Sequence, residues 1–167
     1  MGGQTGATVP PVTDAADRPH ALLVGSAGGH LAQLIRLEPW TEGCTRTWVT
    51  FDKPDARSLL ADEAVIWAYH PTTRNIPNLL RNSVLALRHV RRLRPDIVVS
   101  TGAAVAVPFF VVARLLRIPT VYVEVFDRID SPTLTGRLCR PIATRFCVQW
   151  PEQQAHYPGS VVIGPLL

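Results

Sequence analysis

The sequence predicts an α/β fold in which a Rossmann-like parallel sheet carries helices on both faces. Short apolar runs alternate with amphipathic segments along the chain, and this alternation is typical of βαβ units. The first apolar run ends at a glycine-rich turn, residues 25–29, that leads into a helix. The length of 167 residues fits one domain with a substantial core and is short for two.

Each expected strand is a short run rich in valine, isoleucine, leucine, threonine or aromatic side chains, most of which favour strands. The expected strands are residues 21–24, 47–51, 64–69, 96–100, 120–124, 145–149 and 161–163. The segments between them repeat apolar residues at the helical period. The expected helices are residues 31–37, 55–61, 75–93, 107–116 and 134–142, with a short helical turn before the last strand. The longest of them ends before Pro95, because proline cannot continue a helix.

Residues 1–19 are rich in Gly, Thr, Pro and Asp and contain no apolar run. We expect a disordered tail there, followed by a single Rossmann-like acceptor-binding domain over residues 20–167. The tail has the features of neither a signal peptide nor a membrane span. Cys44, Cys139 and Cys147 are too few and too scattered for a disulfide framework or a zinc site, so we expect thiols in a reducing compartment.

The chain is mildly basic, with 17 Lys and Arg against 13 Asp and Glu and an isoelectric point of about 9.4. This charge permits partners that carry phosphate groups, or an anionic membrane surface. It does not indicate nucleic-acid binding, because no motif of interleaved basic and aromatic residues accompanies it.

The helix expected over residues 75–93 is basic and amphipathic. Its apolar side is expected to contain Leu79, Leu80, Val84, Ala86, Leu87, Val90 and Leu93. Arg81, Arg88 and Arg92 gather on the other side at ~100° per residue. Two compatible interpretations are open. The arginines form the solvated face of a helix that covers the sheet, or they contact anionic lipid headgroups together with Leu85.

The most apolar segment, residues 105–116, is shorter than the roughly 20 residues that a helix needs to cross a bilayer. We therefore expect a buried helix that packs on the sheet. The alternative is an interfacial role for Phe109 and Phe110.

Two glycine-containing loops follow expected strands and open helices. In the first loop Gly28 and Gly29 permit a tight turn, Ser26 precedes them, and His30 stands at the helix start. A helix N-terminus offers unpaired N–H groups and a favourable dipole, so this loop suits a phosphate. The second loop, with Gly102, repeats the arrangement, and both are expected at one cleft. The alternative is that the glycines only make strand-to-helix turns, which are common without a ligand.

A polar cluster follows the fifth expected strand. Glu124 ends this strand, and Asp127 and Arg128 lie in the loop after it. A carboxylate at the ligand-binding edge of a sheet can accept a proton from a hydroxyl group, and an arginine can neutralise phosphate. The alternative for Asp127 is an ion pair with a neighbouring arginine, and we favour a helix-cap role for Asp130 or Ser131.

Four motifs occur in a fixed order along the chain. They are Ser-Ala-Gly-Gly-His-Leu (26–31), Ser-Thr-Gly-Ala-Ala (100–104), Tyr-Val-Glu-Val-Phe-Asp-Arg (122–128) and Phe-Cys-Val-Gln-Trp (146–150). With them the chain resembles PssD-type subunits of bacterial polysaccharide glycosyltransferases. Those subunits are related to the membrane-anchoring subunit of the eukaryotic enzyme that adds the second N-acetylglucosamine to dolichol-linked oligosaccharide. The resemblance covers residues 20–167, and more remotely the chain is similar to the N-terminal half of MurG.

The resemblance implies the N-terminal half of a GT-B glycosyltransferase, with a donor-binding subunit as a separate polypeptide that docks near the C-terminus. The acceptor would be a polyprenyl-diphosphate-linked sugar at the cytoplasmic face of the cell membrane. Eukaryotic members carry an N-terminal membrane helix that residues 1–19 cannot supply, so attachment would be peripheral. A UDP-sugar would be the donor substrate, and no cofactor is expected. No metal is expected either, since the chain has no D-x-D pair.

The resemblance also implies roles for single residues. Gly28 and Gly29 would face the acceptor diphosphate, and Gly102 would belong to the second loop. In an inverting transfer a general base takes the proton of the acceptor hydroxyl, and His30 and Glu124 are both candidates.

Two other functions are open. A non-catalytic scaffold that recruits the catalytic partner subunit to the membrane fits the same half-enzyme. An independent nucleotide-binding Rossmann module is the second alternative, but the chain lacks a G-x-G-x-x-G motif followed by an acidic residue about 20 positions later. The donor sugar stays open among N-acetylglucosamine, glucuronic acid, galactose and glucose.

Overall fold

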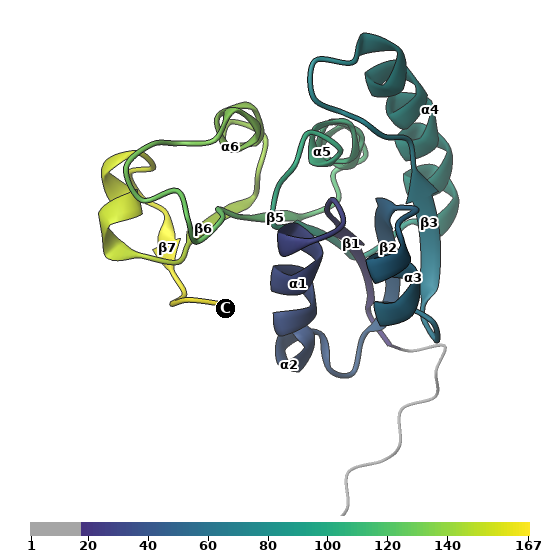
Figure 1. Ribbon diagram of the computed structural model, residues 1–167, viewed down its shortest axis with the longest axis horizontal. Coiled ribbons are helices and arrows are strands. Elements are labelled where there is room, and N and C mark those ends of the chain that lie inside the picture. Colours follow the sequence, from purple (N-terminus) through teal and green to yellow (C-terminus); the bar gives the residue numbers. More distant parts are fainter. Residues whose placement is uncertain (1–17) are drawn as a thin grey trace, which may run out of the picture.

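The computed structural model describes residues 18–167, so the expected tail falls almost entirely outside the described residues. The strands are β1 (His20–Val24), β2 (Thr45–Phe51), β3 (Ala64–Ala68), β4 (Ile97–Ser100), β5 (Thr120–Val123), β6 (Arg145–Val148) and β7 (Val161–Val162). They form one sheet in the order β3-β2-β1-β4-β5-β6-β7, and every neighbouring pair is parallel (Figure 1). The predicted fold class is confirmed.

Helices alternate with the strands as predicted, and element ends differ from the expected ones by only a few residues. The helices are α1 (Gly29–Arg36), α2 (Glu38–Thr41), α3 (Pro54–Leu59), α4 (Ile76–Leu93), α5 (Ala106–Leu115), α6 (Leu134–Cys139) and the 3-10 helix η2 (Pro151–Ala155). The short helix α2 was not expected. It begins directly after α1 and has Pro39 in its first turn. Proline is tolerated there because N–H groups in the first turn of a helix have no partner within the helix.

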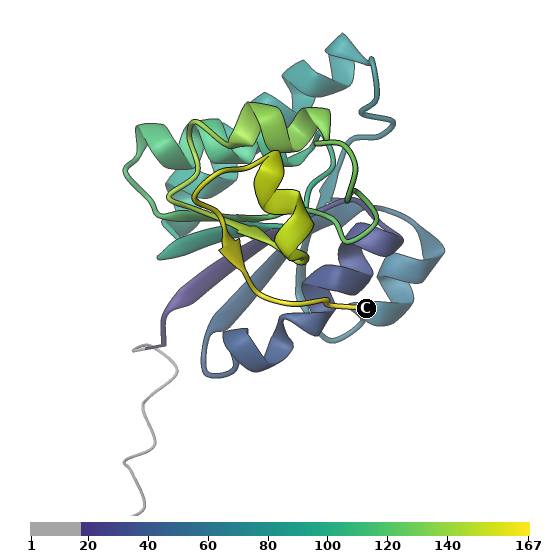
Figure 2. The same cartoon turned by 90° about the vertical axis from the view of Figure 1, so that its left-hand side faces the viewer.

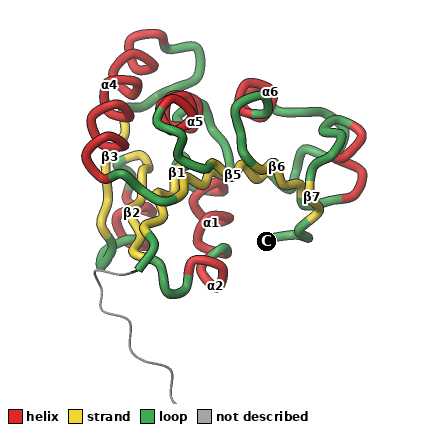
Figure 3. Tube along the Cα trace, turned by 180° about the vertical axis from the view of Figure 1, so that it is seen from behind, coloured by secondary structure: helices red, strands yellow, loops and turns green. Residues whose placement is uncertain are grey.

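Two apolar cores, one on each face of the sheet, hold the elements together. On one face α4, α5 and α6 cover the sheet, and Phe109, Phe110 and Tyr122 are buried beneath them. On the other face Leu31 of α1 and Ala56 of α3 pack on the strands. Figure 3 shows helices on both sides of the sheet. The expected buried helix is thus confirmed, and the alternative interfacial role for Phe109 and Phe110 is wrong.

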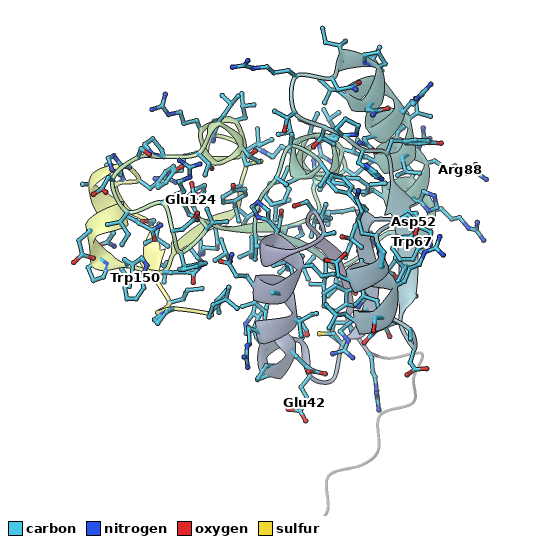
Figure 4. The ribbon with its side chains drawn as sticks, viewed as in Figure 1. Glu42, Asp52, Trp67, Arg88, Glu124 and Trp150 are labelled. Atoms are coloured by element: carbon cyan, nitrogen blue, oxygen red, sulfur yellow. The ribbon has the colours of Figure 1, made fainter. Side chains whose placement is uncertain are left out.

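Helix α4 turns a different side to the interior than expected. Asn78, Asn82, Ala86 and Val90 are its buried residues. Most of the larger apolar residues that we expected to be buried face outward, with 42–68% of their surface exposed: Leu79, Leu80, Val84 and Leu87. Arg81, Arg88 and Arg92 are exposed, and Figure 4 shows Arg88 pointing away from the molecule. Leu85 packs against the core instead, so its expected lipid contact is wrong.

Buried amide groups decide this orientation of α4. The Asn82 side chain accepts a hydrogen bond from the Tyr69 N–H and donates one to the Tyr69 carbonyl, each at 2.9 Å. Asn78 donates to the Pro71 carbonyl at 2.9 Å. The backbone groups of Tyr69 and Pro71, in the loop after β3, need hydrogen-bond partners, and α4 supplies them by turning Asn78 and Asn82 inward. The leucines and the valine on the other side of α4 therefore face outward.

Within residues 18–167, part of the sheet has no helical layer on the α1 side. There the segment after β7 returns toward α1 as an extended chain (Figures 1 and 2). An open apolar groove of about 420 Å³ lies on this face. Its lining consists of Leu37, Trp40, Val99, Val121, Val123, Arg145, Cys147, Val161, Ile163 and Leu166. We call it the C-terminal groove.

Candidate functional site

The loops that follow β1, β4 and β5 meet at one edge of the sheet. β1 and β4 are neighbours although β2 and β3 come between them in the chain, and ligands bind at such a reversal of strand order. A pocket of about 260 Å³ opens at this edge. Its lining consists of Gly29, His30, Gln33, Ala103, Val125, Phe126, Asp127, Arg128, Thr133 and Thr135. We call it the edge pocket.

His30 reaches the edge pocket from the first turn of α1 and is half-buried. Its Nδ1 lies 2.8 Å from the Thr101 carbonyl oxygen, and the Thr101 hydroxyl donates to the His30 carbonyl at 2.7 Å. A carbonyl oxygen only accepts, so Nδ1 carries the proton in the neutral ring. Nε2 is then left with a lone pair, and His30 is prepared to accept a proton.

Gly102 supports the His30 ring from the second loop. Its φ of +112° lies in the region that favours glycine. A Cβ at this position would be 3.0 Å from His30 Cε1 and 3.0 Å from the Tyr122 hydroxyl. The Gly102 N–H is held by the Ser100 hydroxyl at 2.9 Å. Gly102 therefore serves the site by leaving room for the ring.

Glu124 does not face the edge pocket. It is fully buried, between β5 and α6 (Figure 4). Its carboxylate accepts hydrogen bonds from the Val125 N–H at 3.0 Å, from the Thr133 hydroxyl at 3.0 Å and from the Tyr157 hydroxyl. These contacts give it a positioning role and contradict its expected role as a general base, because a substrate cannot reach an enclosed carboxylate.

Burial and the neighbouring Glu124 raise the pKa of a nearby hydroxyl and a nearby thiol. Burial, and then the hydrogen bond to Glu124, raise the pKa of the Tyr157 hydroxyl. Burial and the charge of Glu124 raise the pKa of the Cys139 thiol to about 12. A side chain at Gly136 would overlap the carboxylate, so α6 approaches it through a glycine.

Thr133 connects Glu124 to the edge pocket. Its hydroxyl accepts the Gly136 N–H at 2.9 Å and so caps α6. The expected caps, Asp130 and Ser131, are both exposed, and that expectation is wrong. Thr133 is the N-cap of α6 because its hydroxyl both accepts the Gly136 N–H and donates to the buried carboxylate of Glu124.

The first glycine loop is only partly directed at the edge pocket. Gly29 lines it, whereas Gly28 and Ser26 do not. The Gly28 N–H donates to the Asp55 carboxylate at 2.9 Å. Since this donor already has a partner from the start of α3, the structure does not support the expected contact of Gly28 with a diphosphate.

Asp127 and Arg128 are exposed on the opposite wall of the edge pocket. Within residues 18–167 neither forms an ion pair, so the alternative of an ordinary ion pair is wrong. Sequence reasoning missed Gln33 and Thr135, which also line the pocket. Gln33 could have been found, because it follows His30 by one helical turn and so lies on the same side of α1.

The family model "Oligosaccharide biosynthesis protein Alg14 like" matches residues 69–166, more than half of the sequence. The chain belongs to the Alg14 family. Human "UDP-N-acetylglucosamine transferase subunit ALG14" is 31% identical over 87% of the chain and 82% of that protein. A MurG-type enzyme of Symbiobacterium thermophilum, a pyrophosphoryl-undecaprenol N-acetylglucosamine transferase, is 43% identical over 48% of the chain and 21% of the enzyme.

Solved structures show the same fold over most of the chain. MurG of Acinetobacter baumannii superposes with a TM-score of 0.70 at 20% identity, over 88% of the chain and 45% of MurG. The UDP-GlcNAc 2-epimerase of Neisseria meningitidis superposes with a TM-score of 0.68 at 12% identity, over 88% of the chain and 47% of the epimerase. The chain thus spans less than half of these proteins, and its fold is that of the Rossmann-like N-terminal half.

We expect Gly102→Ala to displace the His30 ring and to break its bond to Thr101. The free energy of unfolding should fall by about 3 kcal/mol, the sum of a positive-φ penalty and an overpacking penalty. The 15N shifts of the His30 ring report the change of hydrogen bonding. Gly43→Ala is the control, since its φ of +84° carries the backbone penalty with no atom near the added Cβ. Equal effects of the two variants would contradict the role of Gly102.

Proposed function

We propose that the chain is the acceptor-binding, membrane-associated subunit of a two-component inverting glycosyltransferase. It presents a polyprenyl-diphosphate-linked sugar as the acceptor in polysaccharide biosynthesis. The donor is a UDP-sugar that carries N-acetylglucosamine or a related sugar. The observation that carries this proposal is the His30 ring, held through Nδ1 by the Thr101 carbonyl at the edge pocket of an Alg14-family chain. The family match also argues against an independent nucleotide-binding module.

In this proposal His30 is the general base. The acceptor hydroxyl gives its proton to Nε2 while its oxygen forms the bond to the anomeric carbon of the donor sugar. The bond between that carbon and the UDP oxygen breaks on the opposite side, so the configuration inverts and UDP leaves with the electron pair. The charge of UDP is stabilised by the donor-binding subunit, and neither metal nor cofactor is invoked.

The acceptor diphosphate is proposed to bind between two walls of the edge pocket. On one wall Gly29 and His30 begin α1, where N–H groups have no intrahelical partner and the helix dipole favours an anion. On the other wall Arg128 is exposed and unpaired within residues 18–167. Asp127 beside it is suited to accept a hydrogen bond from a sugar hydroxyl.

Membrane attachment is proposed to use the outer surface of α4, α5 and α6. Exposed apolar side chains lie on all three helices, among them Leu80 at 62%, Leu115 at 75% and Leu134 at 73% exposure. None of the three helices contains Asp or Glu. Arg88 and Arg92 stand beside the apolar stripe of α4. No helix within the described residues could cross a membrane, and the proposed contact is peripheral, at the cytoplasmic face.

The donor-binding subunit is proposed to place a helix in the C-terminal groove. All-parallel sheets are covered on both faces, and this face of β6 and β7 has no cover within residues 18–167. Trp40 and Ile163 are 54% and 41% exposed there. A helix with an apolar stripe matches such a surface. The human relative's name, a transferase subunit, supports a partner polypeptide.

We expect His30→Ala to lower transfer from UDP-N-acetylglucosamine to polyprenyl-diphosphate-linked N-acetylglucosamine by about 10²–10⁴-fold, the usual contribution of a general base. The assay uses the chain together with its donor-binding subunit. His156→Ala removes an exposed histidine outside the edge pocket and should leave the rate unchanged. A full rate for His30→Ala would favour the non-catalytic scaffold.

We expect Arg88→Gln/Arg92→Gln to weaken binding to phosphatidylglycerol vesicles by about 30-fold, since each arginine near an anionic surface contributes about 1 kcal/mol. Vesicle sedimentation measures the effect. Arg36→Gln/Arg145→Gln removes two exposed charges from the opposite side of the sheet and is the matched control. If both double variants lose binding equally, net charge rather than the α4 surface is responsible.

We expect Ile163→Asp to weaken association with the donor-binding subunit by at least about 30-fold, as at other apolar interface centres. Titration calorimetry without membranes measures the affinity. Leu138→Asp, at an apolar position of α6 that is 50% exposed against 41% for Ile163, should bind normally. Unchanged affinity of Ile163→Asp would place the partner elsewhere.

A further inference from the structure

A single buried side chain joins three separate segments of the chain. Gln149, at the end of β6, is 1% exposed. Its amide NH2 donates to Gln33 Oε1 at 2.6 Å and to the Glu124 carbonyl at 2.9 Å. Its Oε1 accepts the N–H of Leu166 at 2.8 Å. Both hydrogens and the oxygen of the amide are thus used.

One end of this connection lies in the edge pocket. Gln33 lines the pocket, is 2% exposed and follows His30 by one turn of α1. Its own NH2 points back to the Gly29 carbonyl at 3.3 Å, at the start of the helix. The Gln149 amide is therefore the group that fixes Gln33 Oε1 in the pocket wall.

The other end lies in the C-terminal groove. Leu166 lines this groove together with Trp40 and Ile163. Its N–H is bonded to Gln149 rather than to another strand. Figure 2 shows the C-terminal segment running past the sheet toward α1. The same amide consequently touches the groove segment and the pocket wall.

We propose that Gln149 is a positioning residue that couples occupation of the C-terminal groove to the wall of the edge pocket. A partner helix that presses on the groove segment holds Leu166 against Gln149, and Gln149 then holds Gln33 at the acceptor. This coupling rests on the proposed function, which supplies the donor-binding subunit in the groove and the acceptor in the edge pocket. The connection itself can be tested on the chain alone.

The first test follows the Gln33 side-chain amide by NMR in the full chain. Deletion of Leu166 and Leu167 removes the N–H that Gln149 accepts, and should shift the Gln33 signals. Deletion of Leu167 alone keeps that N–H and is the matched control. In a Gln149→Leu background the longer deletion should leave Gln33 unmoved. Equal shifts in both backgrounds, or none in the native sequence, would overturn the connection.

The second test uses the complex with the donor-binding subunit. Gln149→Leu should raise KM for polyprenyl-diphosphate-linked N-acetylglucosamine by about tenfold with kcat changed less than about twofold, the pattern of lost binding. Asn82→Leu removes a buried amide that is not part of the pocket lining, and it should lower the melting temperature without changing KM. An unchanged KM for Gln149→Leu would refute the positioning role.

A double variant separates positioning from folding. Gln33→Leu/Gln149→Leu replaces both side chains of the Gln33–Gln149 hydrogen bond with apolar groups. It removes the cost of the unpaired Gln33 oxygen that Gln149→Leu alone leaves behind, while the Glu124 carbonyl and the Leu166 N–H lose their partner in both variants. Its KM should stay raised while its melting temperature recovers toward that of the native chain. If KM and the melting temperature both returned to the values of the native chain, the Gln149→Leu variant would have affected only folding. If the native complex transfers no sugar, the proposed function fails, and the NMR test still decides whether the connection exists.

Discussion

An all-parallel sheet must be covered on both faces, and the rest of this structure follows from how the chain meets that requirement. Three helices, α4, α5 and α6, cover one face, while α1 and α3 cover only part of the other. The strand order reverses between β1 and β4, so the loops that carry chemistry gather at that point of the edge. The remaining apolar strand surface is open for a partner, as the C-terminal groove.

At the edge itself, two loops far apart in sequence are locked together by a reciprocal pair of bonds. His30 donates from its ring to the Thr101 carbonyl, and Thr101 returns a bond from its hydroxyl to the His30 carbonyl. The pair fixes the ring in position and in tautomer at once. Gly102 makes the close approach possible, because any Cβ there would lie 3.0 Å from the ring. The edge pocket is thus arranged before a substrate arrives.

The alternation of elements and the position of His30 at the edge of the sheet could be predicted, because they depend on local periodicity and on one glycine-rich turn. The role of Glu124 could not. A carboxylate at a strand end has the same sequence pattern whether it faces solvent or an interior tyrosine, and Tyr157 is contributed by a distant segment. The outward apolar face of α4 was missed for a related reason, since the pairing of Asn82 with Tyr69 depends on a loop conformation. Gln149 belongs to the motif at residues 146–150, but its three partners come from three segments, and a sequence motif does not show such contacts.

The three proposed surfaces lie on different sides of one sheet, and this separation has a mechanistic consequence. The α4–α6 surface faces one way, the C-terminal groove faces the other, and the edge pocket opens between the two at the strand ends. In the proposed complex, a lipid-linked acceptor held at the α4–α6 surface would reach the pocket without crossing the partner interface. A donor-binding subunit docked on the groove would close over the same pocket without displacing the lipid. The proposed division into two polypeptides would therefore leave the pocket accessible to the acceptor. The hydrogen bonds of Gln149 to Gln33 and Leu166 would give the docked subunit a short buried connection to the pocket wall.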